Sequence, residues 1–218
     1  MKRFITYTAV FFIGLSAQQV SAQRGWNVSI NANPHFSWML NKDDNQSEDF
    51  DRRSTINTAF GVGVGYNFSH RAGLGLGVLY SLQGQKYKLE DEQLNQRMNY
   101  FKLPLTFNYV FNPRSKVALV GKVGPQLSIL AASRVKDADG KTVIDNSKEY
   151  FKDVTFGGAA GLSTQFNLGK QWFLTTGLRY DFDFTNAEDE KHPDFTQGRK
   201  KTHNMTAGLE IGLKYSFH

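Results

Sequence analysis

The sequence predicts an all-β protein, an eight-stranded antiparallel up-and-down transmembrane β-barrel with short periplasmic turns and long extracellular loops. Three observations point to this fold. A secretory signal opens the chain, apolar residues alternate with small or polar ones in eight segments, and the connections between those segments alternate between long and short. Period-two alternation indicates strands with two unlike faces. Alternating connection lengths are typical of outer-membrane barrels.

The composition narrows the class of protein. The 218 residues are 40% hydrophobic with a mean hydropathy of −0.45, which excludes a polytopic helical membrane protein. Cysteine is absent, so a disulfide scaffold, a thiolate metal site and a cysteine nucleophile are excluded. The formal net charge of +6 falls to +4 without Lys2 and Arg3, and this mild excess predicts no nucleic-acid partner. The 20 Gly and 18 Phe residues suit a barrel with a crowded interior.

Residues 1–22 are predicted to be a secretory signal peptide, cleaved after Ala22, which leaves residues 23–218 as the barrel domain. The segment begins with two basic residues, continues with about a dozen apolar residues and ends on Val20-Ser21-Ala22, a small-x-small cleavage site. The apolar run is too short for a transmembrane helix, which needs about 20 apolar residues.

The first four predicted strands each show the alternation. In residues 26–38, tryptophan, valine, isoleucine and phenylalanine share one face. In residues 60–68 and 74–82, bulky apolar residues alternate with glycine, which leaves room inside a narrow lumen. In residues 101–111, leucine and aromatic residues alternate with polar ones. A face of that length crosses about 24 Å of hydrocarbon, at roughly 3.3 Å per residue and a tilt of about 45°.

The last four predicted strands complete the barrel. Residues 117–129 alternate less clearly, with aliphatic residues opposing Lys122 and polar side chains. Residues 156–168 set phenylalanine and leucine against glycine, serine and glutamine. Residues 172–184 and 205–217 place aromatic and aliphatic side chains opposite charged ones.

Prolines interrupt three of these strands. A proline cannot donate a ladder hydrogen bond, and a missing bond is costly in a closed sheet that has no free edge. We therefore expect bulges or displaced strand limits at Pro34, Pro104 and Pro125.

The predicted connections place the long loops at one end and the tight turns, with both termini, at the other. The long ones are residues 41–54, 85–99, 133–152 and 185–201, and the short ones are 69–72, 112–116 and 169–171. Within the third long connection, Asp139-Gly140 predicts a hairpin turn between strands that extend beyond the membrane.

The apolar faces are predicted to contact lipid. A secreted lipocalin-like barrel would show the same period with its apolar face inside. However, alternate residues in 61–65 and in 73–77 are glycine, and these two glycine rows fit a narrow lumen. The apolar faces also end in aromatic residues: Trp26, Tyr66 and Trp172 at the turn end, Trp38 and Tyr180 at the loop end. Two such belts are typical of the two membrane interfaces.

Three short stretches carry a resemblance to a known family. They are Leu76-Gly77-Val78-Leu79-Tyr80-Ser81-Leu82-Gln83-Gly84, Tyr100-Phe101-Lys102-Leu103-Pro104-Leu105 and Gly121-Lys122-Val123-Gly124-Pro125-Gln126-Leu127-Ser128. They resemble the PorT-like outer-membrane β-barrel family of Bacteroidetes-type bacteria. The resemblance implies the barrel fold, the outer membrane and a link to protein secretion across that membrane. It implies no catalytic or ligand residues.

Seven charged residues fall on the predicted inward face, and we call them the lumen charges. They are Lys102, Lys122, Arg179, Asp181, Asp183, Glu210 and Lys214. Unpaired charges in a narrow lumen are expensive, so we expect a cross-strand network that fills the lumen. Loss of Arg179 would then leave one of the three carboxylates without a partner. An ion path or a ligand contact is the alternative.

Arg199, Lys200 and Lys201 precede the last predicted strand at the loop end, where lipopolysaccharide phosphates would lie. We expect these three side chains to make electrostatic contact with lipid phosphate, and the alternative is that they lie in a solvated loop. A lipid-modifying enzyme would need a nucleophile beside a histidine and an acid. No histidine falls beside an inward serine and acid in the predicted strands. We therefore expect no enzyme, no catalytic residue, no cofactor and no metal ion.

The function expected from these observations is that of a structural, interaction or assembly component of the outer membrane with a closed lumen. The first alternative is a narrow pore or small-ligand carrier that uses the lumen charges, and the second is a barrel-embedded lipid-modifying enzyme. The expected partners are outer-membrane lipid, the barrel-assembly machinery during biogenesis, and an envelope or secretion protein.

Overall fold

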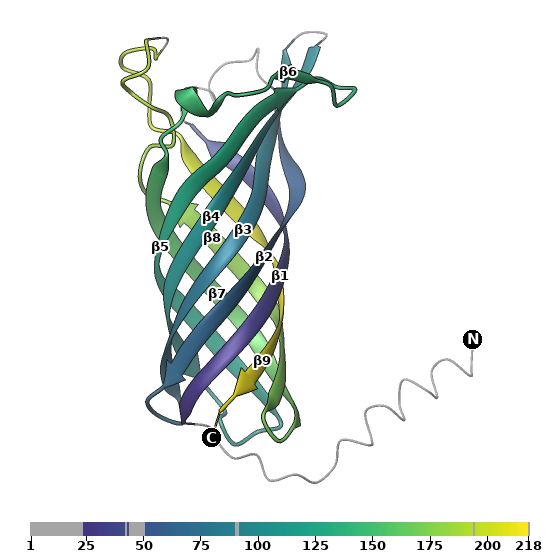
Figure 1. Cartoon of the computed structure of the whole chain (residues 1–218), viewed down its shortest axis with the longest axis vertical. Helices are drawn as coiled ribbons and strands as arrows, with labels where there is room; N and C mark the ends of the chain where they lie inside the picture. Colours follow the sequence, from purple (N-terminus) through teal and green to yellow (C-terminus); the bar gives the residue numbers. More distant parts are fainter. Residues whose placement is uncertain (1–23, 42, 44–50, 90–91, 194, 218) are drawn as a thin grey trace, which may run out of the picture.

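A closed antiparallel β-barrel dominates the computed structural model, which describes residues 24–41, 43, 51–89, 92–193 and 195–217 (Figure 1). The predicted signal peptide lies outside these residues. The wall consists of β1 (Gly25–Leu40), β2 (Asp51–Asn67), β3 (Ala72–Leu89), β4 (Glu92–Val110), β5 (Val117–Lys136), β7 (Val154–Gly169), β8 (Trp172–Asp183) and β9 (His203–Ser216).

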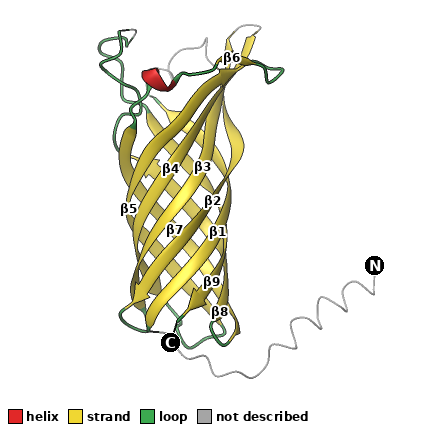
Figure 2. Ribbon diagram, viewed as in Figure 1, coloured by secondary structure: helices red, strands yellow, loops and turns green. Residues whose placement is uncertain are grey.

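The eight long strands follow one another around the ring in chain order. Pairing of β1 with β9 and of β4 with β5 closes the sheet, so the wall has no free edge. The predicted eight-stranded up-and-down barrel is therefore confirmed. At the loop end, the short β6 (Thr142–Ile144) pairs with β5, and a 3-10 turn, η1 (Lys148–Tyr150), follows it (Figure 2). No helix within the described ranges is long and apolar enough to cross a membrane.

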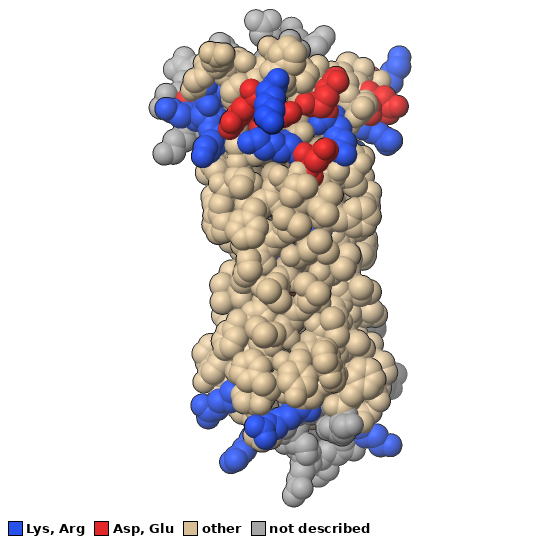
Figure 3. All heavy atoms as spheres, turned by 60° about the vertical axis from the view of Figure 1, so that its left-hand side comes forward, with Lys and Arg blue, Asp and Glu red and all other residues tan. Residues whose placement is uncertain are grey.

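The two faces of the wall separate as the alternation predicts. Leu209 and Ile211 are 50% and 46% exposed on the outside, whereas Glu210 between them is 5% exposed and points inward. On the face drawn in Figure 3, a broad belt without Lys, Arg, Asp or Glu separates two charged ends. Aromatic pairs border the belt, such as Trp26 with Tyr66, whose ring centroids are 5.2 Å apart.

One predicted long loop is wrong, because residues 85–89 and 92–99 are strand. β3 and β4 pair as far as Leu89 and Glu92 and form a hairpin that extends the ladder. The alternation continues there in polar side chains: Gln85 and Gln96 are 1% and 7% exposed. A polar inward face does not register as hydrophobic periodicity, so the hydrophobic pattern stops before these strands end.

The hairpin predicted at Asp139-Gly140 is confirmed. The Gly140 amide donates to the Asp137 carbonyl at 3.1 Å, the Asp137 amide donates to the Lys141 carbonyl at 3.0 Å, and Lys136 pairs with Thr142 across the turn. Gly140 has a φ of +81°, a conformation that glycine adopts without strain.

The predicted bulges at the prolines are wrong. Pro34, Pro104 and Pro125 each keep an in-register partner on one neighbouring strand: Thr58, Gln126 and Gly158 respectively. With the neighbouring strand on the other side, the residue pairing is interrupted beside each proline and resumes beyond it in the same register. In an antiparallel sheet, a residue directs its N–H and its C=O to the same neighbour. A proline therefore interrupts the ladder toward one strand only, and the other strand holds the register.

Candidate functional site: the lumen and the two ends

The structure places all seven lumen charges inside the barrel. Lys102 comes from β4 and Lys122 from β5, Arg179, Asp181 and Asp183 share β8, and Glu210 and Lys214 share β9. Residues two apart on a strand point to the same face, which explains why three charges of β8 enter the lumen together.

Five of these residues form a chain of ion pairs across the lumen, which we call the charge cluster: Lys102, Asp181, Arg179, Glu210 and Lys122. Lys102 Nζ lies 2.8 Å from Asp181 Oδ2, and Arg179 Nε lies 2.9 Å from Asp181 Oδ1. Arg179 Nη1 lies 3.3 Å from Glu210 Oε2, and Lys122 pairs with Glu210 Oε1. Each carboxylate thus serves two cations.

The charge cluster connects strands that are not neighbours in the wall. Lys102 on β4 reaches Asp181 on β8, and Lys122 on β5 reaches Glu210 on β9. Glycine provides the space, since Arg179 pairs in register with Gly161 on one side and Gly208 on the other. These contacts cross the barrel interior rather than following the sheet.

Neutral side chains complete the hydrogen bonding of the charge cluster. Thr206 Oγ1 donates to Asp181 Oδ2 at 3.1 Å, and Arg179 Nη2 donates to Gln126 Oε1 at 3.0 Å. Gln126 and Thr206 are 1% and 4% exposed. Both lie an even number of positions from a lumen charge, Gln126 from Lys122 and Thr206 from Glu210, and so share its face, but nothing in the sequence links them to the charges.

The other two lumen charges have neutral partners in the described part of the chain. Asp183 accepts hydrogen bonds from Thr155 Oγ1 at 2.9 Å, Asn204 Nδ2 at 3.3 Å and Ser128 Oγ at 3.4 Å. Lys214 donates to Gln165 Oε1, and its Nζ lies 5.0 Å from the centroid of the Phe173 ring.

A polar cavity of about 130 Å³ lies between the charge cluster and the turn end. The glycine rows of β2 and β3, with neutral side chains such as Asn27 and Asn108, line its wall, and Arg179, Glu210, Lys122 and Lys214 also face it. The cavity is therefore cationic on balance and has room for a few water molecules or one small anion.

The three basic residues predicted to contact lipid phosphate have different surroundings. Arg199 donates from Nε and Nη2 to both carboxylate oxygens of Glu188, at 2.9 and 3.1 Å, so a carboxylate already holds its guanidinium. Lys200 and Lys201 are exposed, and the backbone amide of Lys200 donates to Asp43 at 2.6 Å. Contact of Arg199, Lys200 and Lys201 with lipid phosphate stays a prediction.

Further contacts tie the last long loop to the barrel mouth. Asn41 donates to Thr202 Oγ1 at 2.8 Å, and the Thr202 amide donates to Asn186 Oδ1 at 2.9 Å. The side-chain hydrogen bond from Asn186 and the charge of Lys152 lower the pKa of Glu190. These bonds attach the two ends of the loop, near Asn186 and Thr202, to each other and to the end of β1.

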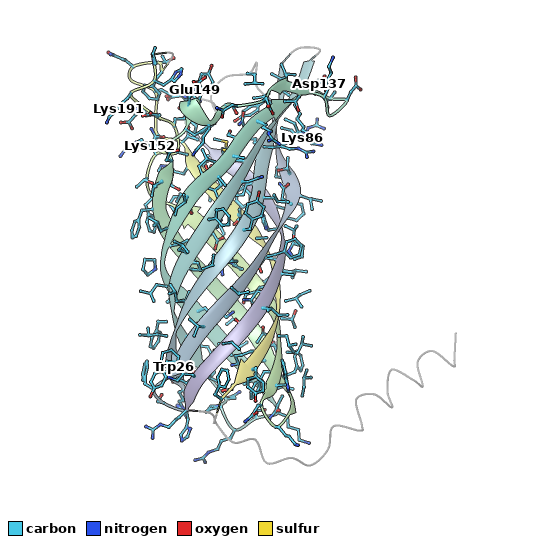
Figure 4. All side chains as sticks on the ribbon, in the orientation of Figure 1. Trp26, Lys86, Asp137, Glu149, Lys152 and Lys191 are labelled. Carbon is cyan, nitrogen blue, oxygen red and sulfur yellow. The ribbon has the colours of Figure 1, made fainter. Side chains whose placement is uncertain are left out.

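A loop-end pocket of about 280 Å³ lies between η1 and this loop. Its lining includes the aromatic side chains Tyr150, Phe151, His192 and Phe195, together with Glu188 and Arg199. The rings of Tyr150 and His192 have centroids 4.4 Å apart. The labelled residues Glu149, Lys152 and Lys191 lie at this end of the molecule in Figure 4, opposite Trp26. Sequence reasoning missed the pocket because loop residues have no period that shows which of them meet.

Comparison with known proteins agrees with the geometry. Residues 5–217 match the family profile described as "Outer membrane protein beta-barrel domain". The outer membrane protein OprG from Pseudomonas aeruginosa superposes with a TM-score of 0.56 at 15% identity, covering 92% of this chain and 100% of OprG. Neisserial surface protein A superposes with a TM-score of 0.50 at 13% identity, covering 88% and 97% of the two chains. These identities show the fold alone, and no curated protein sequence matches the chain.

Proposed function

The chain belongs to the outer membrane protein beta-barrel domain family, and we propose that it serves in the bacterial outer membrane as an interaction or assembly component with a closed lumen. Family membership gives the location. The proposed role rests on the way the lumen is filled and on the ordered loop end.

The charge cluster is the observation that carries the proposal. Lys102 and Asp181 are 3% and 5% exposed, and the five side chains come from four strands around the ring. An ion crossing the barrel would have to separate buried ion pairs, and breaking such pairs costs several kcal/mol. A filled lumen favours a function on the outer surface of the barrel.

The loop end is the proposed contact surface. Hydrogen bonds from Asn41, Asn186 and Thr202 order it, and the loop-end pocket presents aromatic rings beside a charged pair. Aromatic residues and arginine are enriched where proteins bind other proteins.

The proposed partner is an envelope or secretion protein. The secretion link is supported only by the resemblance of stretches in β3, β4 and β5 to PorT-like proteins. Lipid surrounds the barrel, and the barrel-assembly machinery is the proposed partner during biogenesis.

Conductance in planar bilayers tests the closed lumen. The purified protein should give no steady open-channel current. A steady current whose ion selectivity shifts in Glu210→Gln would contradict the proposal and favour a pore.

Cross-linking in the native membrane, followed by affinity purification and mass spectrometry, tests the interaction surface. The parent protein should capture an envelope partner that Tyr150→Ala with Phe195→Ala loses. Asn112→Ala in the β4–β5 turn at the opposite end is the matched control and should retain the partner. Equal capture by both variants would exclude the loop-end pocket as the contact.

A small-ligand carrier is the second candidate, and the cationic cavity favours it. Lys214 faces this cavity with a neutral partner, Gln165, and Lys122 lies on the same cavity wall. Inorganic phosphate should then raise the thermal stability of the detergent-solubilised protein, and Lys214→Gln should abolish the increase.

No enzymatic activity is part of our proposal, and unchanged lipid A and phospholipid mass spectra in a deletion strain would agree with that.

A further inference from the structure

The turn end of the barrel carries exposed basic residues and no acidic ones among its described residues. We call the exposed Lys and Arg side chains there the basic ring: Arg24, Arg71, Arg114, Lys116 and Lys170. No Asp or Glu occurs in residues 24–31, 65–75, 108–118, 165–175 or 213–217. In Figure 3, Lys and Arg project from the lower rim, whereas the upper end mixes both signs.

The basic ring surrounds the barrel rather than forming a patch on one side. Arg71 lies in the β2–β3 turn, Arg114 and Lys116 in the β4–β5 turn, Lys170 in the β7–β8 turn, and Arg24 directly before β1. Because the strands follow chain order around the ring, these four places are distributed over the whole circumference.

The basic ring also lies at a defined depth. Trp26 and Trp172 each follow a ring residue by two positions, which is about 7 Å along a strand. They are 58% and 46% exposed and pack against Tyr66 and Tyr215, with ring centroids 5.2 and 4.9 Å apart. Exposed tryptophan and tyrosine mark the boundary between hydrocarbon and head groups. The basic side chains just beyond them therefore reach phosphate depth.

We propose that the basic ring binds the phosphate groups of anionic phospholipids in the periplasmic leaflet. Basic residues at a membrane surface gain energy from anionic lipid, and the gain falls within a Debye length. Lipid is the partner that surrounds the barrel on all sides at this depth, whereas a soluble acidic protein would contact one side. The loop end differs, because it carries carboxylates as well as cations, for example in the ion pairs Lys148–Asp153 and Arg199–Glu188, each at 2.9 Å.

The three tryptophans allow a direct test with brominated lipids, which quench tryptophan fluorescence on contact. Trp38→Phe leaves Trp26 and Trp172 as reporters of the turn end, and Trp26→Phe with Trp172→Phe leaves Trp38 as the reporter of the loop end. Each protein is reconstituted in vesicles of phosphatidylcholine and phosphatidylglycerol, with one or the other lipid brominated. Both leaflets then have the same composition, so the orientation of the barrel does not matter.

At the turn end, brominated phosphatidylglycerol should quench about twofold more effectively than brominated phosphatidylcholine at equal mole fraction. The preference should fall to about one in 0.5 M NaCl, and also in the combined variant Arg71→Gln, Arg114→Gln, Lys116→Gln and Lys170→Gln. Trp38 should show a smaller preference that this variant leaves unchanged.

Equal quenching by both lipids at the turn end of the parent protein would overturn the proposal. So would a preference that survives both salt and the combined variant. The salt series on the parent protein gives a result even if the variant does not fold.

Discussion

At the residue scale, a single step along β9 decides between lipid and lumen. Ile211 is 46% exposed on the outer wall, while Glu210 is 5% exposed and pairs with Lys122 and Arg179. The difference arises because successive side chains of a strand point to opposite faces. The identity of each residue therefore has to match its face.

Ile211→Arg should destabilise the barrel by about 2 to 4 kcal/mol, because it places a charge on the lipid face. Reversible urea unfolding of the protein in lipid vesicles measures this change, and Ile211→Leu is the matched control with little expected effect. If the arginine variant unfolds at the parent urea concentration, Ile211 does not face hydrocarbon.

Gly124→Ala should cost about 1 to 3 kcal/mol, because the new methyl group would overpack the wall. A Cβ on Gly124 would lie 1.9 Å from the Leu105 carbonyl oxygen, a backbone atom that can move only with its strand. At Gly77 the nearest atom is Pro104 Cγ at 3.3 Å, so Gly77→Ala should be milder. The same unfolding assay ranks the two, and a reversed ranking would contradict the packing described for Gly124.

At the element scale, the charge cluster joins four strands through two carboxylates. Removal of Arg179 leaves neither Asp181 nor Glu210 without a cation, contrary to the expectation from the sequence. Asp181 keeps Lys102 at 2.8 Å, and Glu210 keeps Lys122. Asp183 already has neutral partners. Asp181 is the more critical member, since it is the only carboxylate paired with Lys102 among the described residues, whereas Arg179 also pairs with Glu210.

Asp181→Asn should therefore destabilise the barrel more than Arg179→Met. The first change leaves Lys102, which is 3% exposed, without its carboxylate. We expect about 3 to 5 kcal/mol for that loss and about 1 to 3 kcal/mol for Arg179→Met, which leaves two complete ion pairs. Urea unfolding midpoints give the comparison. A larger loss in Arg179→Met would show that Arg179, and not Asp181, is the centre of the cluster.

At the scale of the whole molecule, closure of the sheet leaves no long strand with a free edge. Every long strand pairs on both sides, and the outer wall exposes large apolar side chains along its length. The wall is suited to lipid, where every backbone polar group has to be satisfied within the protein.

Unboiled and boiled samples should therefore migrate differently on detergent gels, because the closed barrel resists the detergent until it is heated. The Ile211→Leu variant should show the same shift. Identical mobility together with recovery in a detergent-free soluble fraction would refute the membrane barrel.

The sequence by itself determined the features that follow from local periodicity. Alternation at period two identified eight strands and the face of each, including the inward direction of all seven lumen charges. The hairpin at Asp139-Gly140 also follows from local preference, since it depends on the backbone freedom of one glycine.

Only the tertiary structure decided features that depend on the register between strands. The ends of β3 and β4 lie beyond the hydrophobic pattern because inward-facing glutamines continue the ladder. Pro104 stays in register because β5 pairs with it on the side that needs no donor. The partners of Lys102 and Lys122 lie on strands three places away around the ring. An eight-stranded lumen is narrow enough for a lysine side chain to reach across it, and period two, which acts along one strand, carries no information about what lies opposite.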